Sequence, residues 1–194
     1  SRHFILGSQN ADKITHLDDI KKLSCLNGPE KVTLMGNGFD VHAFEPGRKM
    51  MLAGVEIPDV DYGFKAHSDG DVAIHALIDA LLGAAGLGDI GMLFPDTSHE
   101  YKDIDSKILL TRCVTTLHHL GYEIINADVT IAAEAPRLGN YKKTMRETLA
   151  PLLHIDIARM NIKATTTEKL GFVGRKEGVA VIASATLNYF DWTK

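Results

Sequence analysis

The sequence predicts an α+β protein in which a mixed β-sheet packs against helices on one face. Segments with the two-residue period of a strand alternate with segments of helical period, and turn signals also join neighbouring strands as hairpins. This mixture argues against a purely parallel sheet. The strand expected at 179–190 carries small, fairly apolar residues on both faces, so we expect one face to pack on helices and the other on a neighbouring subunit.

The expected elements are segments with a regular apolar period. In chain order they are a strand at 32–42, a strand or hairpin arm at 49–57, helices at 71–85 and 104–120, a strand at 124–133, a helix at 141–153, and strands at 161–166 and 179–190. Gly36 and Gly38 interrupt the first strand, and Ser68 with Asp71 can cap the first long helix. Gly121 ends the second helix.

Residues 1–31 differ from the regular pattern of 32–194, so we expect a domain boundary between them. The turn-forming run at 27–29 marks a linker. Before it, Thr15 and Asp18 fit a capping box that opens a short helix.

Composition excludes several classes of protein. The net charge of −4 argues against general nucleic-acid binding, which usually requires a basic surplus. No stretch approaches the roughly 18–20 apolar residues of a membrane span, and no secretory signal is visible, so no membrane association is expected. Cys25 and Cys113 have no metal-site spacing and form no disulfide framework, which favours a reducing cytoplasm.

Metal-ligating residue types occur on one strand and one helix. Asp40 and His42 are two residues apart on an expected strand and therefore share a face. Asp71, His75 and Asp79 recur every four residues and share a helix face. A third ligand from this helix would complete a zinc site with one open position, and Asp79 could orient a ligand imidazole. The alternative interpretations are an acid–base site or an ordinary solvated helix face.

Two loops carry further candidates. The glycine pattern at 86–91 resembles a dinucleotide motif, but it closes a helix instead of opening one, so we interpret it as a helix stop that leads to Asp89 and Asp96. Three threonines at 165–167 precede Glu168; they can hold phosphate oxygens, and Glu168 can hold a second, harder cation. The alternatives are a strand rich in Thr and, at 171–178, an ordinary hairpin turn.

At this point the motifs resemble those of a known family, 2-C-methyl-D-erythritol 2,4-cyclodiphosphate synthase. The matching motifs follow one another in register from about residue 32 to residue 190. They are Gly38-Phe-Asp-Val-His42, His67-Ser-Asp-Gly-Asp71, His75-Ala through Asp79-Ala-Leu-Leu-Gly-Ala-Ala, Gly88-Asp-Ile-Gly91, Phe94-Pro-Asp96, and Lys163-Ala-Thr-Thr-Thr-Glu168 through Arg175.

The resemblance implies a homotrimer with active sites between subunits, and it implies roles for particular residues. Zn²⁺ would be held by Asp40, His42 and His75, and Mg²⁺ or Mn²⁺ by Glu168. The residues implied at the substrate are His67 and Thr166 as catalytic contacts, Ser68 and Thr165 at phosphates, Asp89 and Gly91 at the ribose, Ile90, Phe94 and Asp96 at the methylerythritol, and Ala133, Pro136 and Arg137 at the cytosine. Phe172 and Arg175 would lie towards the trimer axis, where family members can hold isoprenoid diphosphates.

Three positions depart from the usual family pattern: Asn37, Ser98 and Arg137. Only Ser98, which stands where an acidic residue is common, puts a substrate contact in doubt. In addition, residues 7–23 resemble the end of the cytidylyltransferase of the same pathway, which implies an upstream cytidylyltransferase domain in a bifunctional protein.

The resemblance implies a cyclisation of 4-diphosphocytidyl-2-C-methyl-D-erythritol 2-phosphate that releases CMP. Two rival functions fit the same residues. A metal-dependent phosphodiesterase would use the open metal position to activate water, and a binding module would only sense isoprenoid diphosphates in a trimer cavity.

Overall fold

The computed structural model describes residues 14–21, 23, 28–95, 101 and 103–192. Their main sheet has five strands in the order β4-β1-β7-β5-β6. The strands are β1 (Leu34–Pro46), β4 (Tyr62–Phe64), β5 (Tyr122–Ala132), β6 (Met160–Thr165) and β7 (Gly178–Tyr189). All neighbours are antiparallel except β5 and β6, so the prediction of a mixed sheet is confirmed.

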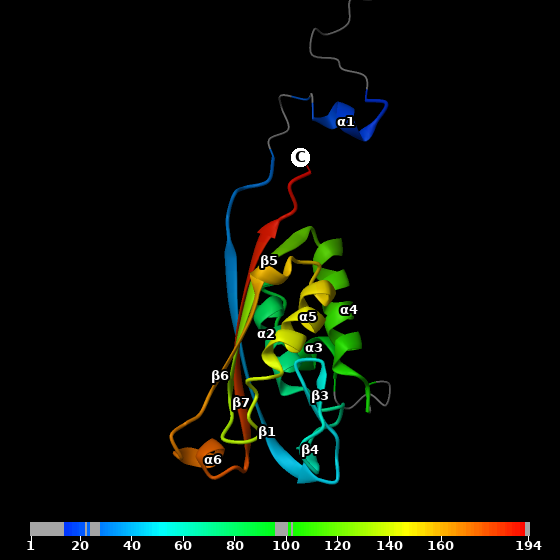
Figure 1. The fold of residues 1–194 in the computed structure, drawn as a ribbon. Coiled ribbons are helices and arrows are strands. Elements are labelled where there is room, and N and C mark those ends of the chain that lie inside the picture. Colours follow the sequence, from blue (N-terminus) through cyan, green and yellow to red (C-terminus); the bar gives the residue numbers. More distant parts are fainter. Residues whose placement is uncertain (1–13, 22, 24–27, 96–100, 102, 193–194) are drawn as a thin grey trace, which may run out of the picture.

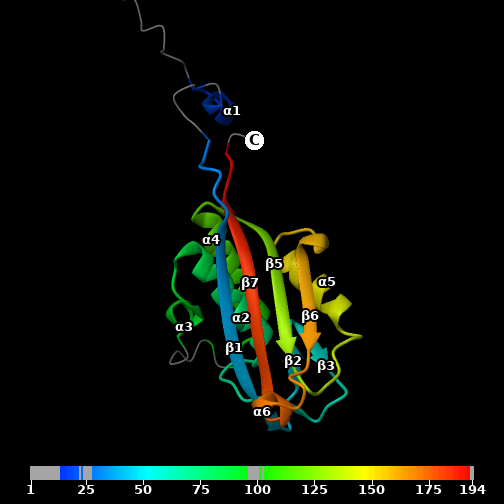
Figure 2. The same ribbon diagram turned by 90° about the vertical axis from the view of Figure 1, so that its left-hand side faces the viewer.

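Three long helices cover one face of this sheet and leave the other face bare (Figures 1 and 2). They are α2 (Val72–Ala85), α4 (Ser106–His119) and α5 (Lys142–Leu152). The prediction of helices on a single face is therefore confirmed. A small hairpin of β2 (Met50–Leu52) and β3 (Val55–Ile57) takes the place of the strand or hairpin arm expected at 49–57.

Short elements complete the described part of the chain. They are α1 (Leu17–Ile20), α3 (Ile90–Leu93), a 3₁₀ turn (Ile157–Arg159) and α6 (Gly171–Gly174). The cap expected at Thr15 and Asp18 was wrong by one residue. His16 is the N-cap of α1, and the Asp19 carboxylate accepts the backbone N–H of both Thr15 and His16 at 2.9 Å.

The two glycines of β1 do not interrupt the strand; they let a helix approach it. A Cβ atom at Gly36 would lie 2.1 Å from the carbonyl oxygen of Ala80, and one at Gly38 would lie 1.9 Å from that of Ala76. The alanines of α2 therefore pack directly on the β1 backbone, which only glycine permits.

The core lies between the sheet and the three helices, and it includes the fully buried Ile78, Leu110 and Val181. Cys113 is also buried there as a free thiol, and burial raises its pKa to about 12, so it is an unreactive packing residue. None of the described helices is long and apolar enough to cross a membrane.

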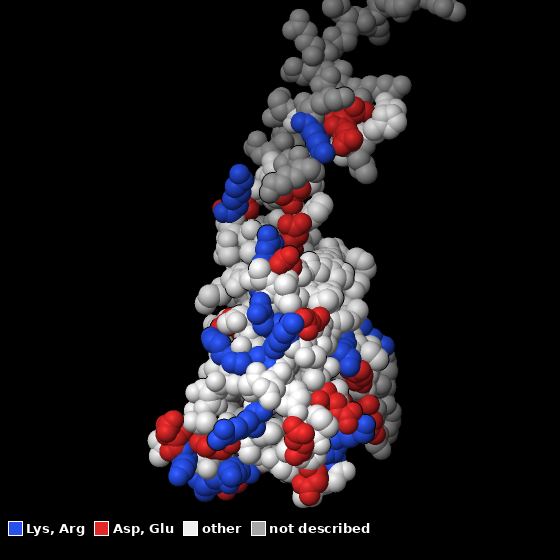
Figure 3. All heavy atoms as spheres, viewed as in Figure 1, with Lys and Arg blue, Asp and Glu red and all other residues white. Residues whose placement is uncertain are grey.

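The bare face of the sheet carries exposed apolar side chains. Met35, Phe39 and Val41 of β1 are 66%, 62% and 42% exposed, and Ile182 of β7, opposite Phe39, is 53% exposed. Elsewhere, on the face shown in Figure 3, Lys and Arg are interspersed with Asp and Glu. An exposed apolar patch of this kind is typical of a surface that contacts another molecule.

Candidate metal centre and active site

The alternation of β1 and the contact between β1 and α2 bring three expected ligands together. Asp40 and His42 lie on the β1 face that carries Gly36 and Gly38, which is the face turned to α2. His75 is the fourth residue of α2. One ligand atom from each of Asp40, His42 and His75 lies within 4.8 Å of the others.

The three side chains of the triad interact electrostatically with one another. Asp40 Oδ2 lies 3.1 Å from His42 Nε2 and 3.4 Å from His75 Nδ1. Burial by itself would raise the pKa of Asp40, but hydrogen bonds and charges from both histidines hold it well below its usual range. Burial would lower the pKa of His42, but the hydrogen bond and charge of Asp40 outweigh burial and raise it.

The donor set fits a zinc ion. One carboxylate oxygen and two imidazole nitrogens are ligands that zinc accepts, and three protein ligands leave a fourth position open. The outer nitrogen of His42, Nδ1, lies 3.0 Å from the carbonyl oxygen of Gly70. A carbonyl only accepts, so Nδ1 carries a proton, and Nε2 is the nitrogen that would bind a metal.

A cavity of about 320 Å³ opens beside the triad and is lined in part by His42 and His75. Several residues expected at the substrate also line this cavity. They are His67, Ser68, Ile90, Gly91 and Phe94. Asp96 and Ser98 lie outside the described residues.

The hydroxyl of Ser68 lies at this cavity. Its Oγ accepts from the backbone N–H of Gly70 at 3.2 Å and lies 3.1 Å from His75 Nε2. If both neighbours donate, the Ser68 proton is available to an acceptor in the cavity, such as a phosphate oxygen.

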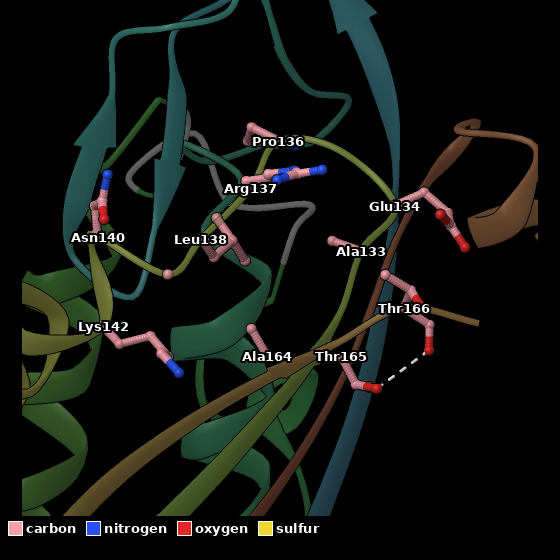
Figure 4. Close-up of a pocket in the computed structure, with 11 residues that line it drawn as sticks. Ala133, Glu134, Pro136, Arg137, Leu138, Asn140, Lys142, Ala164, Thr165 and Thr166 are labelled. Atoms are coloured by element: carbon pink, nitrogen blue, oxygen red, sulfur yellow. Dashed lines mark hydrogen bonds between the residues drawn. The ribbon is translucent and has the colours of Figure 1, made fainter. Parts of the chain in front are cut away.

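A second cavity, of about 670 Å³, lies beside the carboxyl ends of β5 and β6 (Figure 4). Five of the expected residues line it. They are Ala133, Pro136, Arg137, Thr165 and Thr166. Arg137 and Lys142 lie above and below Leu138 in Figure 4, and both extend towards the side formed by Ala133, Ala164 and Thr165.

Sequence reasoning missed Lys142 and Glu134 in this cavity. Lys142 begins α5 and lines the cavity, whereas the neighbouring Lys143 is exposed and lies 3.7 Å from Glu147. Nothing in the local sequence separates the two lysines. Glu134 accepts the backbone N–H of Lys169 at 2.8 Å and so ties this cavity to the loop that carries Glu168.

The remaining candidates lie outside these two cavities. Glu168 is exposed after β6 in a left-handed conformation (φ 52°), and its Oε1 accepts from Thr166 Oγ1 at 3.1 Å. Asp89 caps α3 by accepting from Met92 N at 2.9 Å. Arg175 forms a two-pronged pair with Glu177 at 2.8 and 3.0 Å, and Phe172 lines a third cavity of about 340 Å³.

Two carboxylates of the expected helix face have other roles. Asp71 is fully buried and accepts four backbone N–H groups, those of Ala53, Gly54, Ala73 and Ile74, so it is a structural cap and not a ligand. Asp79 Oδ1 accepts from Ile90 N at 2.8 Å, and the outer nitrogens of the two imidazoles lie against the carbonyl of Gly70 and the hydroxyls of Ser68 and Ser106 instead.

The two cavities share no lining residue and lie next to different strands of the sheet. The triad uses β1, the larger cavity uses β5 and β6, and β7 lies between β1 and β5. The metal-ligating group and the basic cavity are thus separate within one chain.

The chain has an α+β fold, with one carboxylate and two imidazoles at a cavity. These features place it among enzyme domains that can hold a divalent metal. Comparison with known proteins then identifies the family. The model of the YgbB family matches residues 33–188, and this chain belongs to the YgbB family.

Relatives agree with this assignment. The chain is 65% identical over 194 residues to the bifunctional enzyme IspD/IspF of Sulfurimonas denitrificans, covering 100% of this chain and 50% of that one. The structure of the bifunctional IspDF from Campylobacter jejuni matches with a TM-score of 0.89 and 50% identity, covering 99% of this chain and 52% of that chain. A 2C-methyl-D-erythritol-2,4-cyclodiphosphate synthase in its CDP-bound form matches with a TM-score of 0.73 and 36% identity. The match covers 79% of this chain and 99% of that chain.

The chain thus spans about half the length of the bifunctional relatives that it matches. It covers nearly the whole of the solved synthase. The resemblance that the motifs indicated is confirmed at the level of the family.

Proposed function

We propose that this chain cyclises 4-diphosphocytidyl-2-C-methyl-D-erythritol 2-phosphate to the 2,4-cyclodiphosphate and releases CMP. The observation that carries this proposal is the Asp40–His42–His75 group at a cavity lined by His67 and Ser68. A solved relative bound to CDP supports a cytidine nucleotide as a ligand of this chain, and we assign this nucleotide to the larger cavity.

In the proposed reaction the 2-phosphate attacks the β-phosphorus, and the bond to CMP breaks. Because the attack is intramolecular, the chain has mainly to hold the two phosphates in line and offset their charge. A Zn²⁺ at the triad and a Mg²⁺ or Mn²⁺ at Glu168 would supply Lewis acidity and neutralise phosphate charge.

The side chains of the two cavities have separate tasks in this proposal. His67 and the Ser68 hydroxyl orient the phosphate nearest the triad, while Thr165 and Thr166 hold the phosphate of the departing CMP. Arg137 and Lys142 offset the negative charge of the nucleotide. Ile90, Gly91 and Phe94 enclose the methylerythritol, and Asp89 and Asp96 complete the sugar contacts.

We further propose a homotrimer in which each active site joins two subunits. Each chain has the triad on the β1 side and the nucleotide cavity on the β6 side, so a ring of copies would bring one next to the other. The bare apolar sheet face would turn inwards. Phe172 and Arg175 would then lie near the axis, where an isoprenoid diphosphate is a candidate ligand.

We propose a domain division at residue 31, with residues 1–31 as the end of a cytidylyltransferase domain and its linker, and 32–194 as the synthase domain. The match of the YgbB family model to residues 33–188 and the bifunctional relatives support this proposal. We place the enzyme in the cytoplasm, in keeping with its free buried Cys113.

Incubation of the purified chain with the cytidylylated substrate tests the activity. Cyclisation yields CMP and a cyclic diphosphate, and a phosphodiesterase would yield CMP and an acyclic bisphosphate. A binding module would yield neither product, and either of these two results would reject the proposed function.

Substitution of Ile182 by Asp should disrupt the trimer. A charge on the bare sheet face would be buried in the proposed assembly, which is costly without a partner. Light scattering should report a loss of trimer. The matched control is Ile108→Asp, since Ile108 is 46% exposed on α4 and should tolerate the charge. A trimer that survives Ile182→Asp, or a wild-type monomer with full activity, would contradict the assembly.

Glu168→Gln should weaken binding of the second cation without affecting zinc. The amide keeps the size of the side chain but is a poorer ligand for a hard cation. We expect zinc content to remain at the wild-type level while the Mg²⁺ or Mn²⁺ concentration needed for half-maximal rate rises. Loss of zinc together with no rescue by added Mg²⁺ would show that the two sites are not divided in this way.

Lys142→Ala should raise KM for the substrate, because it removes a cation from the nucleotide cavity. The loss of one charge-assisted contact corresponds to about 1.5–3 kcal/mol, or roughly a ten- to a hundred-fold change. Lys143→Ala removes the same charge from the adjacent residue and should leave KM unchanged. Equal increases in KM for both substitutions would mean that the overall charge of the protein, and not a contact of Lys142 with the substrate, causes the effect.

A further inference from the structure

Two side chains outside the expected ligand set, Asp69 and Ser106, are connected to the ligand His75. Ser106 is fully buried, begins α4, and follows His75 by 31 residues. Its Oγ lies 3.0 Å from His75 Nε2 and 2.5 Å from Asp69 Oδ1. The hydroxyl therefore stands between a carboxylate and the outer nitrogen of the imidazole.

The chemistry of these groups assigns the protons. An ionised carboxylate only accepts hydrogen bonds, and a hydroxyl has a single proton, so Ser106 donates to Asp69. Towards His75 the Ser106 oxygen can then only accept, which requires a proton on His75 Nε2. Nδ1 is then the nitrogen that would bind a metal, and it lies 3.4 Å from Asp40 Oδ2 in the ligand group.

Asp69 is itself held in place by the backbone. Its Oδ2 accepts from Ser106 N at 3.1 Å, its Oδ1 accepts from Asp71 N at 3.2 Å, and its own N–H donates to the carbonyl of Ile104 at 3.1 Å. The carboxylate can therefore fix the direction of the Ser106 hydroxyl.

We propose that Asp69 and Ser106 are positioning residues that fix the tautomer and ring orientation of His75, so that Nδ1 faces the metal. Hydrogen-bond partners of metal-bound histidines commonly set ligand geometry in this way. Neither residue lines the cavity beside the triad, so neither acts as a substrate contact. This inference rests on the metal site of the proposed function.

Ser68 can partly replace Ser106 as a hydrogen-bond partner of His75. Its Oγ lies 3.1 Å from the same His75 Nε2, so the ring keeps one hydroxyl neighbour when the Ser106 hydroxyl is removed. The backbone N–H of residue 106 also remains, so Ser106→Ala keeps the link between Asp69 and the start of α4. Ser106→Ala therefore tests the effect of the Ser106 hydroxyl alone.

The test is the zinc dissociation constant of the whole chain, measured by competition with a chromophoric chelator. Loss of such a hydrogen-bond partner typically weakens metal binding about 10- to 100-fold. We expect about a 10-fold loss in Ser106→Ala, a loss towards about 100-fold in Ser68→Ala/Ser106→Ala, and about a 10-fold loss in Asp69→Asn, whose amide cannot accept both Ser106 donors. In metal-free protein, long-range ¹H–¹⁵N spectra should show His75 protonated at Nε2 in the wild type and a tautomer mixture in the double variant.

Asp105→Ala is the matched control, because Asp105 caps the same helix through Lys107 N at 2.8 Å without contacting His75. It should destabilise α4 and leave zinc affinity within about two-fold. Unchanged zinc affinity in Ser106→Ala and Asp69→Asn, or an equal loss in Asp105→Ala, would overturn the positioning role alone. A wild-type chain that binds no zinc would overturn the metal site and this inference together.

Discussion

His75→Ala and His42→Ala should each remove nearly all bound zinc and reduce kcat/KM by more than about 100-fold. This bound follows because even the hydrogen-bond partners of ligands are worth about 10- to 100-fold in metal affinity or activity, and a direct ligand must exceed them. His75 supplies Nδ1 and His42 supplies Nε2 to a group whose one further member, among the described residues, is Asp40. Two ligands do not make a structural or catalytic zinc site.

Metal analysis of the purified variants, with circular dichroism to check the fold, measures this effect. His119→Ala is the control, since His119 is an exposed histidine at the end of α4. It should keep both zinc and activity. Near-full zinc occupancy in His42→Ala or His75→Ala would show that the metal is held elsewhere.

Asp71→Ala should lower the free energy of unfolding by about 3 kcal/mol or more. Loss of a helix N-cap costs about 1 kcal/mol, and each buried N–H left without a partner adds about 1–3 kcal/mol. Asp71 caps α2 and also accepts from Ala53 N at 2.8 Å and Gly54 N at 2.6 Å in the turn between β2 and β3. The substitution therefore detaches that hairpin from the helix that carries His75.

Urea unfolding at one fixed chain concentration gives the comparison, because assembly would otherwise shift the apparent stability. Asp105→Ala serves as the reference, since the Asp105 side chain is partly exposed, caps α4 and contacts no second element through its cap hydrogen bond. It should cost only about 1 kcal/mol. A similar loss in both variants would mean that the hairpin contacts of Asp71 contribute little.

The long elements could be predicted from the sequence because their periods are local. The short ones could not: β4, α3 and α6 have three or four residues each, too few for a period, and they depend on their neighbours in the fold. The glycines of β1 were interpreted as interruptions because no local signal reports a helix packed on the strand.

The candidate site divides in the same way. Spacing along β1 and α2 indicated Asp40, His42 and His75, but it also grouped Asp71 with His75. The helix begins at Val72, so Asp71 lies before the first turn, and its side chain turns back to cap the helix. Ser106 had no sequence signal, because the connection that matters joins residues 31 positions apart through a hydroxyl.

The contact between β1 and α2 has a consequence for how this protein can vary. His75 reaches Asp40 and His42 only because Gly36 and Gly38 carry no side chain where Ala76, Ala80 and Ala84 rest on the strand. A methyl group added at Gly38 would push the helix outwards and carry one ligand away from the other two. A substitution at either glycine would therefore strain the packing of α2 and move a metal ligand at the same time, although neither glycine belongs to the ligand group.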